Sequence, residues 1–311
     1  MSRRNKYRLA GLLITWLTLR RPTLEGDTYT IENPLSLLLK NSGVVRLSNG
    51  YRIQYDKENK QEIINLVILA LQNGIRFGEK EGQWKLDPAN GIMETHQGIR
   101  LYLERTELLD ETFLYQIHFS GFDLRDRVVV TAGAYIGDTP LFYAKYGARV
   151  YGFEPDPAVY HMALRNIDLN PELSGRIKIA NYALGKDEEI LFHINPGGSE
   201  VSSIYSIKNN DTVKVKSKSI SSILKDFDIS DPYLLDLDIK GSEYDVIEDP
   251  SIQQFHRVRI EYSPYIINSQ TKSLEYLISK LKGYGFTQFR VYKHNAVRAD
   301  LNNHGTLEAE K

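Results

Sequence analysis

Two short stretches of this chain carry residue types that suit nucleoside binding. The first, Val128–Thr139, is an apolar run that enters a turn containing Gly133 and Gly137. The second, Val150–Phe153, is another apolar run, and Glu154 follows it directly. Glycine lets a ligand approach the backbone, and a carboxylate at the tip of the next strand can accept both hydroxyl groups of a ribose. The spacing therefore predicts an adenosine-binding unit, and we expect its ligand to be S-adenosylmethionine.

Two further carboxylates end apolar runs later in the chain. Asp238 lies near the end of Tyr233–Ile239, and Glu261 ends the run that begins at Val258. The carboxyl ends of parallel strands meet at one edge of a sheet, where ligands bind, so both side chains and the nearby Lys240 are expected in one crevice. A hydroxyl acceptor must lose a proton, so Asp238 and Glu261 are candidate bases, with Lys240 orienting them. The alternative is an internal ion pair between Asp238 and Lys240 that only shapes the turn.

The candidate site therefore has two parts. The predicted catalytic residues are Asp238, Lys240 and Glu261. The predicted cofactor-binding residues are Thr131, Gly133, Ala134, Tyr135, Gly137, Asp138, Thr139, Glu154, Pro155, Asn181, Tyr182 and Asp238. His193 is a further candidate base, although a lone histidine in a strand is more often structural. The chain has no cysteine and no histidine pair at ligand spacing, so no metal site is expected.

The elements that must position these residues follow an α/β pattern from Asp126 onward. Strand-like runs alternate with helix-like runs, which predicts a Rossmann-like, mostly parallel sheet covered on both faces, with an antiparallel hairpin at the C-terminus. Ile190–Ile194 and Thr212–Lys216 are expected to form extra strands. We predict three segments: a basic and apolar helix over 1–32, a smaller α+β region over 33–124, and a nucleoside-binding domain over 125–311.

The first segment could contact a membrane surface. Four basic residues precede the apolar run Leu9–Leu19, and Arg20 and Arg21 follow it. The run is about half of the ~20 residues that a spanning helix needs. It is expected either to pack on the protein or to lie at a membrane interface through Trp16 and the arginines. We expect a cytoplasmic protein, with membrane association as the further option.

Composition narrows the range of partners. The formal net charge is -1, and 41% of the residues are hydrophobic, as in ordinary globular proteins. Sequence-independent binding of nucleic acid requires clustered basic residues, which a net charge of -1 does not suggest, so no nucleic-acid partner is expected. A small-molecule or glycan acceptor is expected instead, and the sequence gives no prediction of the oligomeric state.

Six motifs occur in an order that is specific to one family. They are Gly133-Ala134-x-Ile136-Gly137-Asp138-Thr139, Phe153-Glu154-Pro155-Asp156-Pro157, Asn166-x3-Asn170, Ala183-Leu184-Gly185, Asp238-x-Lys240-Gly241-Ser242-Glu243 and Ile260-Glu261. In these motifs, over roughly residues 111–311, the chain resembles the FkbM-type methyltransferases. The resemblance implies a class I methyltransferase sheet, S-adenosylmethionine as cofactor, and O-methylation of a hydroxyl on a sugar, a glycolipid, a polyketide product or another small metabolite.

The chain departs from that family pattern at several charged positions. Thr131 and Tyr135 stand where the family usually has an acidic residue and an asparagine. The family's Lys-x-Asp-x-Glu pattern reads Asp236-x-Asp238-x-Lys240 here, and the exchanged signs could preserve a pair between Asp236 and Lys240. These departures favour the first rival, a catalytically inactive binding protein with the same fold. The second rival, an NAD-dependent oxidoreductase, rests only on the spacing Tyr276-x3-Lys280.

Overall fold

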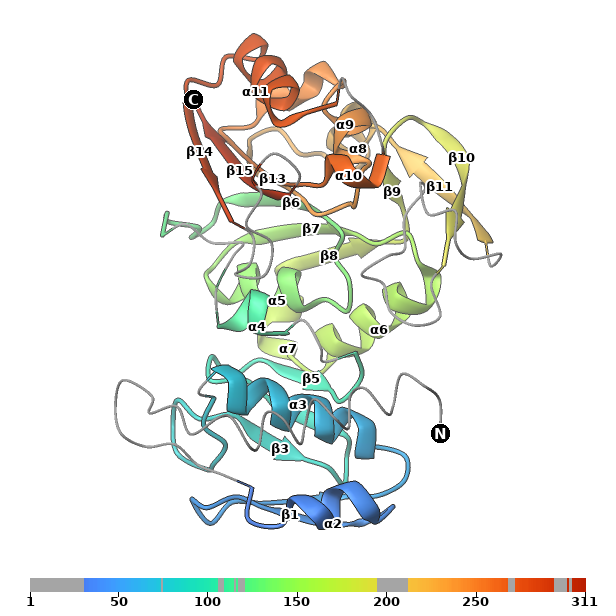
Figure 1. The fold of residues 1–311 in the computed structure, drawn as a ribbon. Coiled ribbons are helices and arrows are strands. Elements are labelled where there is room, and N and C mark those ends of the chain that lie inside the picture. The colour runs from blue at the N-terminus through green and yellow to red at the C-terminus, as the bar shows by residue number, and fades with distance from the viewer. Residues whose placement is uncertain are drawn as a thin grey trace. The chain divides into compact units, whose positions relative to one another are not determined.

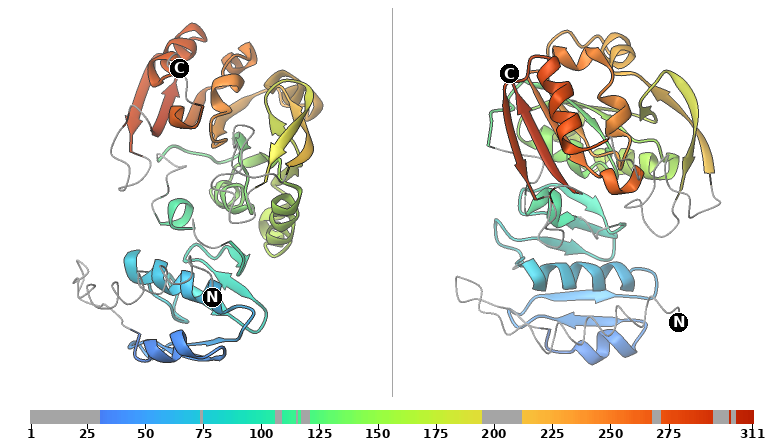
Figure 2. Two further views of the ribbon diagram at one scale, coloured as in Figure 1. Left: turned by 45° about the vertical axis from the view of Figure 1, so that its right-hand side comes forward. Right: turned by 45° about the horizontal axis from the view of Figure 1, so that its top comes forward.

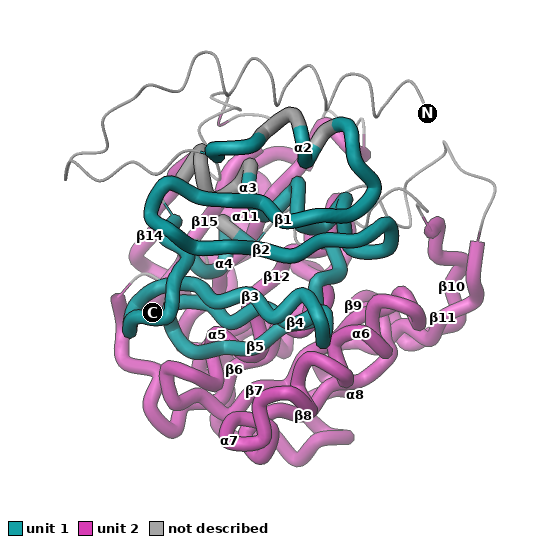
Figure 3. Tube along the Cα trace, turned by 90° about the horizontal axis from the view of Figure 1, so that it is seen from below, with its two compact units in different colours: residues 1–115 teal, residues 116–311 magenta. Residues whose placement is uncertain are grey.

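The computed structural model describes residues 31–73, 75–105, 109–114, 116, 121–194, 212–267, 272–293, 301 and 304–311. The chain divides into two compact units, residues 1–115 and 116–311 (Figure 3). The helix predicted within 1–32 falls almost entirely outside the described residues. The glycine- and serine-bearing sequence 195–203, which predicts a loop, falls wholly outside them. The three-segment division given above remains a prediction.

The described part of residues 1–115 contains two small antiparallel sheets and the helices that accompany them. The described elements are α2 (Pro34–Leu39), β1 (Gly43–Arg46), β2 (Arg52–Tyr55), α3 (Lys60–Asn73), β3 (Lys85–Asp87), β4 (Ile92–Glu94), β5 (Arg100–Tyr102) and α4 (Leu109–Phe113). Strand β1 pairs with β2, and β4 lies between β3 and β5. The Asn49-Gly50 pair between two apolar runs predicts a hairpin, and the antiparallel pairing of β1 with β2 confirms it, with Gly50 in the turn at a φ of 86°. Ile53, Val67 and Trp84 are buried apolar residues of this unit.

Within the described part of residues 116–311, seven strands form the main sheet (Figure 1). They are β6 (Val128–Ala132), β7 (Arg149–Phe153), β8 (Ile177–Ala180), β12 (Pro232–Leu237), β13 (Arg257–Tyr262), β14 (Gln288–Tyr292) and β15 (Gly305–Glu310). Their order is β14-β15-β13-β12-β6-β7-β8. Neighbours pair in parallel except at β15, which is antiparallel to both β13 and β14. The predicted α/β fold, with its antiparallel C-terminal strand, is confirmed.

Helices cover both faces of this sheet, as two views show (Figures 1 and 2). One face carries α5 (Asp138–Lys145), α6 (Pro157–Asp168) and α7 (Pro171–Ser174), and the other carries α8 (Ile220–Asp226), α9 (Glu243–Val246) and α11 (Leu274–Gly283). The short helices η3 (Pro250–Gln254) and α10 (Pro264–Ile267) complete this unit. All five residues of β6 are buried, because the strand lies in the sheet interior between the two helical layers.

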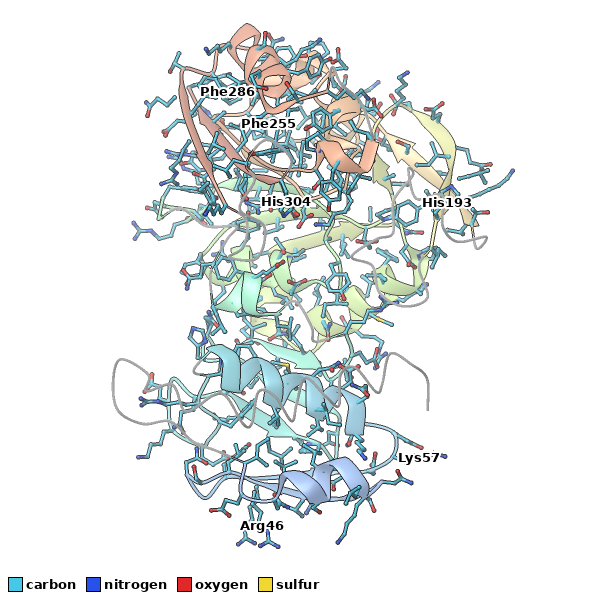
Figure 4. The ribbon with its side chains drawn as sticks, in the orientation of Figure 1. Arg46, Lys57, His193, Phe255, Phe286 and His304 are labelled. Carbon is cyan, nitrogen blue, oxygen red and sulfur yellow. The ribbon has the colours of Figure 1, made fainter. Side chains whose placement is uncertain are left out.

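The main core lies between β6, β12 and β13 and the helices α8, α9 and α11. It is built from aliphatic and aromatic side chains such as Leu235, Ile260, Phe255, Leu277 and Phe286. Phe255 and Phe286 are labelled in Figure 4. This apolar layer fixes the sheet, so the residues at the carboxyl ends of the strands have a rigid base.

A second, three-stranded sheet projects from the main one. It consists of β9 (Ala183–Leu184), β10 (Glu188–His193) and β11 (Thr212–Lys218), in the order β10-β11-β9. The extra strands predicted near 190–194 and 212–216 are thus confirmed. The sequence of residues 177–183 predicts one continuous strand, which is wrong. The chain turns after Ala180, where the Tyr182 N–H donates to the Ala180 carbonyl, and β9 then pairs with β11.

Over the described ranges, none of the helices combines the length and the hydropathy needed to cross a bilayer.

Candidate active site

The loop between β6 and α5 has a backbone that only glycine adopts without strain. Gly133 has a φ of 82° and Gly137 a φ of 87°. A Cβ atom added to Gly133 would lie 2.1 Å from the carbonyl oxygen of Asp238, which leaves no space for any side chain. The loop between these glycines therefore lies directly against the end of β12.

Glu154 connects this loop to the end of β7. Its side chain is buried, and its carboxylate accepts the backbone N–H of Tyr135 at 3.0 Å and that of Asp156 at 2.9 Å. An ionised carboxylate offers about four acceptor positions, and these two backbone donors use two of them. The structure thus brings the predicted glycine turn and the predicted ribose-binding carboxylate together.

Two asparagine side chains hold the backbone around this pair. Asn166 of α6 donates to the carbonyl oxygen of Ile136 at 2.8 Å. Asn181 donates to the carbonyl oxygens of Glu154 at 2.7 Å and Pro155 at 2.9 Å. Asn181 was predicted to bind cofactor, and its described contacts fix the turn that carries Glu154.

The other predicted cofactor residues lie around the same loop. Ala134 is buried in the loop, and Asp138 and Thr139 are buried in the first turn of α5, where the helix dipole favours negative charge. Tyr182 is partly buried against the main core, and the Lys218 ammonium lies 5.4 Å from its ring centroid. Ala134, Asp138 and Thr139 follow the end of β6 or begin α5, as the sequence predicted, whereas Tyr182 lies in the turn after β8 and not within a strand.

The predicted catalytic residues form one cluster. The Lys240 ammonium lies 2.7 Å from Asp238 Oδ1 and 2.8 Å from Glu261 Oε2. The side chains of Lys240 and Asp238 are 25% and 21% exposed, whereas that of Glu261 is only 3% exposed. Lys240 also has a φ of 46°, a left-handed conformation that costs energy for a residue with a side chain. The turn after β12 is strained in a way that places Lys240 between the two carboxylates.

The protonation state of Lys240 follows from this geometry. Burial alone lowers the pKa of the ammonium, but the carboxylates of Asp238 and Glu261 outweigh it and raise the pKa above its usual value. Lys240 is therefore a cation and a hydrogen-bond donor at neutral pH. It cannot itself take a proton from an acceptor.

Glu243 stabilises the same turn by accepting backbone hydrogen bonds. Its fully buried carboxylate accepts the backbone N–H of Gly241 at 2.6 Å and that of Ser263 at 2.9 Å. Burial raises the pKa of Glu243 to about 7, although these backbone donors favour the charged form. The carboxylate joins the turn after β12 to the end of β13, so it sets the distance between Lys240 and Glu261.

A separate buried network lies within the sheet, below the site. Asp236 accepts hydrogen bonds from Arg259 at 2.6 Å, from the Tyr143 hydroxyl at 2.8 Å and from the Thr131 hydroxyl at 3.3 Å. Asp236 ends up facing a covering helix, because its partner Tyr143 belongs to α5. The suggested pair between Asp236 and Lys240 is wrong, since each has other partners.

This network also shows what Thr131 does in place of an acidic residue. Its hydroxyl donates to a carboxylate on the neighbouring strand, so its described contact is structural. The Asp236 carboxylate is paired with Arg259 and raises the pKa of that guanidinium, against the lowering effect of burial. Burial, with the same carboxylate, also raises the pKa of the Tyr143 hydroxyl.

Two sequence candidates lie outside this cluster. His193 is on β10, in the projecting sheet rather than at the strand ends of the main sheet (Figure 4). Tyr276 and Lys280 lie on α11, and both contact the carboxylate of Glu248. Their shared partner is a structural explanation for the spacing that suggested an oxidoreductase.

Sequence reasoning missed two buried polar residues, Arg259 and His304. Arg259 stands between Val258 and Ile260 in an apolar strand, and a charge at such a position signals a buried partner. His304 directly precedes β15 and carries no motif that could have identified it. In the part of the chain that the structure describes, no group of three or more candidate ligands could hold a metal ion.

The chemistry of these donors fits S-adenosylmethionine. A glycine loop without room for side chains faces a buried carboxylate at the next strand end, and a second carboxylate, Asp238, adjoins Gly133. This is the nucleoside-binding arrangement of a class I methyltransferase. Residues 132–287, just over half of the chain, match the family model described as the methyltransferase FkbM domain. The chain belongs to the FkbM methyltransferases, a family that uses S-adenosylmethionine.

Solved structures of methyltransferases are also similar to this chain. Fibrillarin from Aeropyrum pernix, with bound S-adenosyl-L-methionine, is 13% identical with a TM-score of 0.41, over 87% of this chain and 94% of its own. The N-terminal domain of human METTL16 in complex with SAH is 12% identical with a TM-score of 0.41, over 100% and 98%. Magnesium protoporphyrin IX methyltransferase from Synechocystis PCC 6803 is 11% identical with a TM-score of 0.38, over 67% and 83%. No curated protein sequence matched the chain.

Proposed function

We propose that this protein transfers a methyl group from S-adenosylmethionine to a hydroxyl oxygen on a sugar, a glycolipid or another small metabolite. One observation carries the proposal: the backbone of Asp238 fills the space beside Gly133, while the Asp238 side chain contacts Lys240. The cofactor loop and the polar cluster therefore meet at a single residue.

The residues of the chain would divide the work of this reaction. The bound cofactor supplies an electrophilic methyl group on a sulfonium. Glu154 and the glycine loop hold the nucleoside, and Asp238 takes the proton from the acceptor hydroxyl. Lys240 donates to the acceptor oxygen and orients it, because its ammonium stays charged. Alignment and water exclusion then supply most of the remaining rate acceleration.

Asp238 is a better candidate base than Glu261. A base must come within hydrogen-bonding distance of the proton that it takes. The Asp238 side chain is 21% exposed, whereas that of Glu261 is 3% exposed and lies behind Lys240. Glu261 therefore acts as a positioning group that holds the ammonium.

The alternative is a binding protein without catalysis. It is favoured by the ion pair itself, since Lys240 occupies one oxygen of the candidate base at 2.7 Å. Such a protein would bind S-adenosylmethionine and methylate no hydroxyl acceptor.

Calorimetric titration of the full chain with S-adenosylmethionine and S-adenosylhomocysteine tests the proposal first. Glu154→Gln should weaken binding at least about tenfold, because a hydrogen bond to a charged group contributes about 1.5–3 kcal/mol. Glu188→Gln, at an exposed position on β10, is the control and should bind as the wild type does. Wild-type protein that binds neither ligand would overturn the proposal.

Turnover then separates the two functions. A screen of hydroxylated acceptors with radiolabelled cofactor should find methyl transfer, and Asp238→Asn should reduce kcat by about 100-fold or more, the usual contribution of a general base. Cofactor binding with no labelled product across sugars, glycolipids and small alcohols would favour the binding protein.

The acceptor, the cytoplasmic location and membrane contact through the N-terminal segment remain proposals.

A further inference from the structure

His304 is a buried histidine beside the catalytic cluster that the reaction outlined above does not use. It is 5% exposed and directly precedes β15 (Figure 4). Its Nδ1 lies 3.2 Å from the Ser263 hydroxyl, and its Nε2 lies 3.7 Å from Glu261 Oε1. The ring of Tyr265 packs edge-on against it, with centroids 6.2 Å apart. The imidazole is thus held on three sides.

The surroundings of the ring decide where its proton lies. A carboxylate oxygen facing Nε2 favours a proton on that nitrogen, since two acceptors would repel each other. In the neutral ring, the Ser263 hydroxyl then donates to Nδ1; in the protonated ring, Nδ1 donates to Ser263. In both states Nε2 carries a hydrogen and lies 3.7 Å from Glu261 Oε1, longer than a hydrogen bond but close enough for an electrostatic contact.

Each carboxylate oxygen of Glu261 therefore has its own neighbour. Its Oε1 faces His304, while its Oε2 accepts from Lys240 at 2.8 Å. The side chain is only 3% exposed, so water has little access to replace either neighbour. A change on the His304 side must alter how the carboxylate meets Lys240.

We infer that His304 is a positioning residue for methyl transfer, which acts through Glu261 to hold the Lys240 ammonium against Asp238. The inference rests on the proposed function, because it assigns Lys240 to the acceptor oxygen. His304 couples the start of β15, in the C-terminal hairpin, to the turn after β12.

Chemical labelling of Lys240 tests this coupling without any cofactor or acceptor. Acetic anhydride reacts only with the uncharged amine, and a fall of one unit in the lysine pKa makes that form about tenfold more abundant. His304→Leu and Glu261→Gln should each increase Lys240 acetylation about tenfold, measured by mass spectrometry of the folded full-length protein. Exposed Lys214 in the same sample is the internal control. An unchanged rate at Lys240 in His304→Leu would overturn the inference.

A matched pair of variants guards against a simple folding defect. His304→Gln places an amide N–H where the imidazole Nε2–H lay, whereas His304→Asn is one methylene shorter and reaches only the Nδ1 position. We expect wild-type labelling in His304→Gln and raised labelling in His304→Asn, at similar thermal stability. Equal labelling in the two variants would contradict the inference. His256→Leu, at an exposed histidine, should leave Lys240 unaffected.

Kinetics complete the test. At saturating cofactor, His304→Asn should lower kcat at least about tenfold relative to His304→Gln, with unchanged affinity for S-adenosylhomocysteine. An equal kcat in the two variants would overturn the role in methyl transfer. Failure of the wild-type protein to bind S-adenosylhomocysteine would instead overturn the proposed function, while the labelling would still decide the contact between His304 and Lys240.

Discussion

Gly133 excludes a side chain for two independent reasons, its φ of 82° and a site for Cβ that lies 2.1 Å from the Asp238 carbonyl oxygen. The left-handed conformation alone costs an alanine about 1–2 kcal/mol. The overlap with backbone cannot be relieved by a rotamer change, so the end of β12 must move. We predict that Gly133→Ala lowers the free energy of unfolding by about 3 kcal/mol or more, measured by urea titration, and weakens binding of S-adenosylhomocysteine.

Two other glycines separate the effect of the positive φ from the effect of the steric overlap. Gly285 has a φ of 89° but open space around its Cβ position, and Gly175 has neither constraint. Gly285→Ala should cost about 1 kcal/mol, and Gly175→Ala should lie within about 0.5 kcal/mol of the wild type. The explanation would be wrong if Gly133→Ala cost no more than Gly285→Ala.

Glu243 should make the stability of the protein depend on pH. Its pKa is about 7 in the folded protein and 4.5 in the unfolded chain, so between these values only the folded form keeps the proton. Stability from this group is complete below about pH 4.5 and is lost as the pH rises through 7. We expect the unfolding free energy of the wild type to decrease between pH 5 and pH 7.5 relative to that of Glu243→Gln, by roughly 2–3 kcal/mol. Urea titrations at both pH values measure it, and parallel pH profiles would contradict the assignment.

At the scale of elements, the register of the sheet creates the buried polar row. Thr131 on β6 is opposite Asp236 on β12, and Asp236 is opposite Arg259 on β13. Removing one member of a buried ion pair typically costs 3–5 kcal/mol, because the other charge stays uncompensated. We predict a loss of about that size in Arg259→Leu, measured by denaturant unfolding.

Two comparisons sharpen this prediction. The double variant Asp236→Leu with Arg259→Leu should be more stable than Arg259→Leu alone, since no isolated charge remains. Arg290→Leu breaks an ion pair with Glu308 in which the Arg290 side chain is 58% exposed, and it should cost about 1 kcal/mol or less. Equal losses in Arg259→Leu and Arg290→Leu would show that burial of the pair does not matter.

Long buried elements are easier to predict from the sequence than short ones. Buried parallel strands such as β6 and β12 are long apolar runs, so their positions and the carboxylates after them were predictable. Strand β4 is only three residues long, and the sequence does not predict it. The run 177–183 resembles one strand, because hydrophobicity does not show that β8 pairs with β7 whereas β9 pairs with β11. Short elements contain too few residues to display a period.

The pairing of charges was harder to predict than their positions. The sequence placed Asp238, Lys240 and Glu261 at one edge of the sheet, and the structure brings them within hydrogen-bonding distance. It could not pair Asp236 with Arg259, because that contact depends on strand register over more than twenty residues. His304 was not predictable, since its neighbours come from distant parts of the chain.

At the scale of the whole molecule, the chain has two compact units, and the described cofactor-site residues all belong to residues 116–311. The main core also lies wholly in that unit. Loop 133–137, residue Glu154 and the turn after β12 are joined by hydrogen bonds and close backbone contact within it. Cofactor binding should therefore stabilise residues 116–311 and leave residues 1–115 unchanged, unless the two units are energetically coupled.

Hydrogen exchange with S-adenosylhomocysteine tests that expectation. A ligand at 100 times its Kd stabilises the bound state by about 2.7 kcal/mol, so openings that disrupt its site become about 100-fold rarer. We predict slower exchange in peptides covering 133–137, 154–156 and 238–243, and unchanged exchange in β1 to β5. Glu154→Gln at the same ligand concentration should show a much smaller effect. If β1 to β5 were protected as strongly as the glycine loop, the units would be coupled on binding; the small α+β region would then take part in cofactor recognition, and the site would not be confined to residues 116–311.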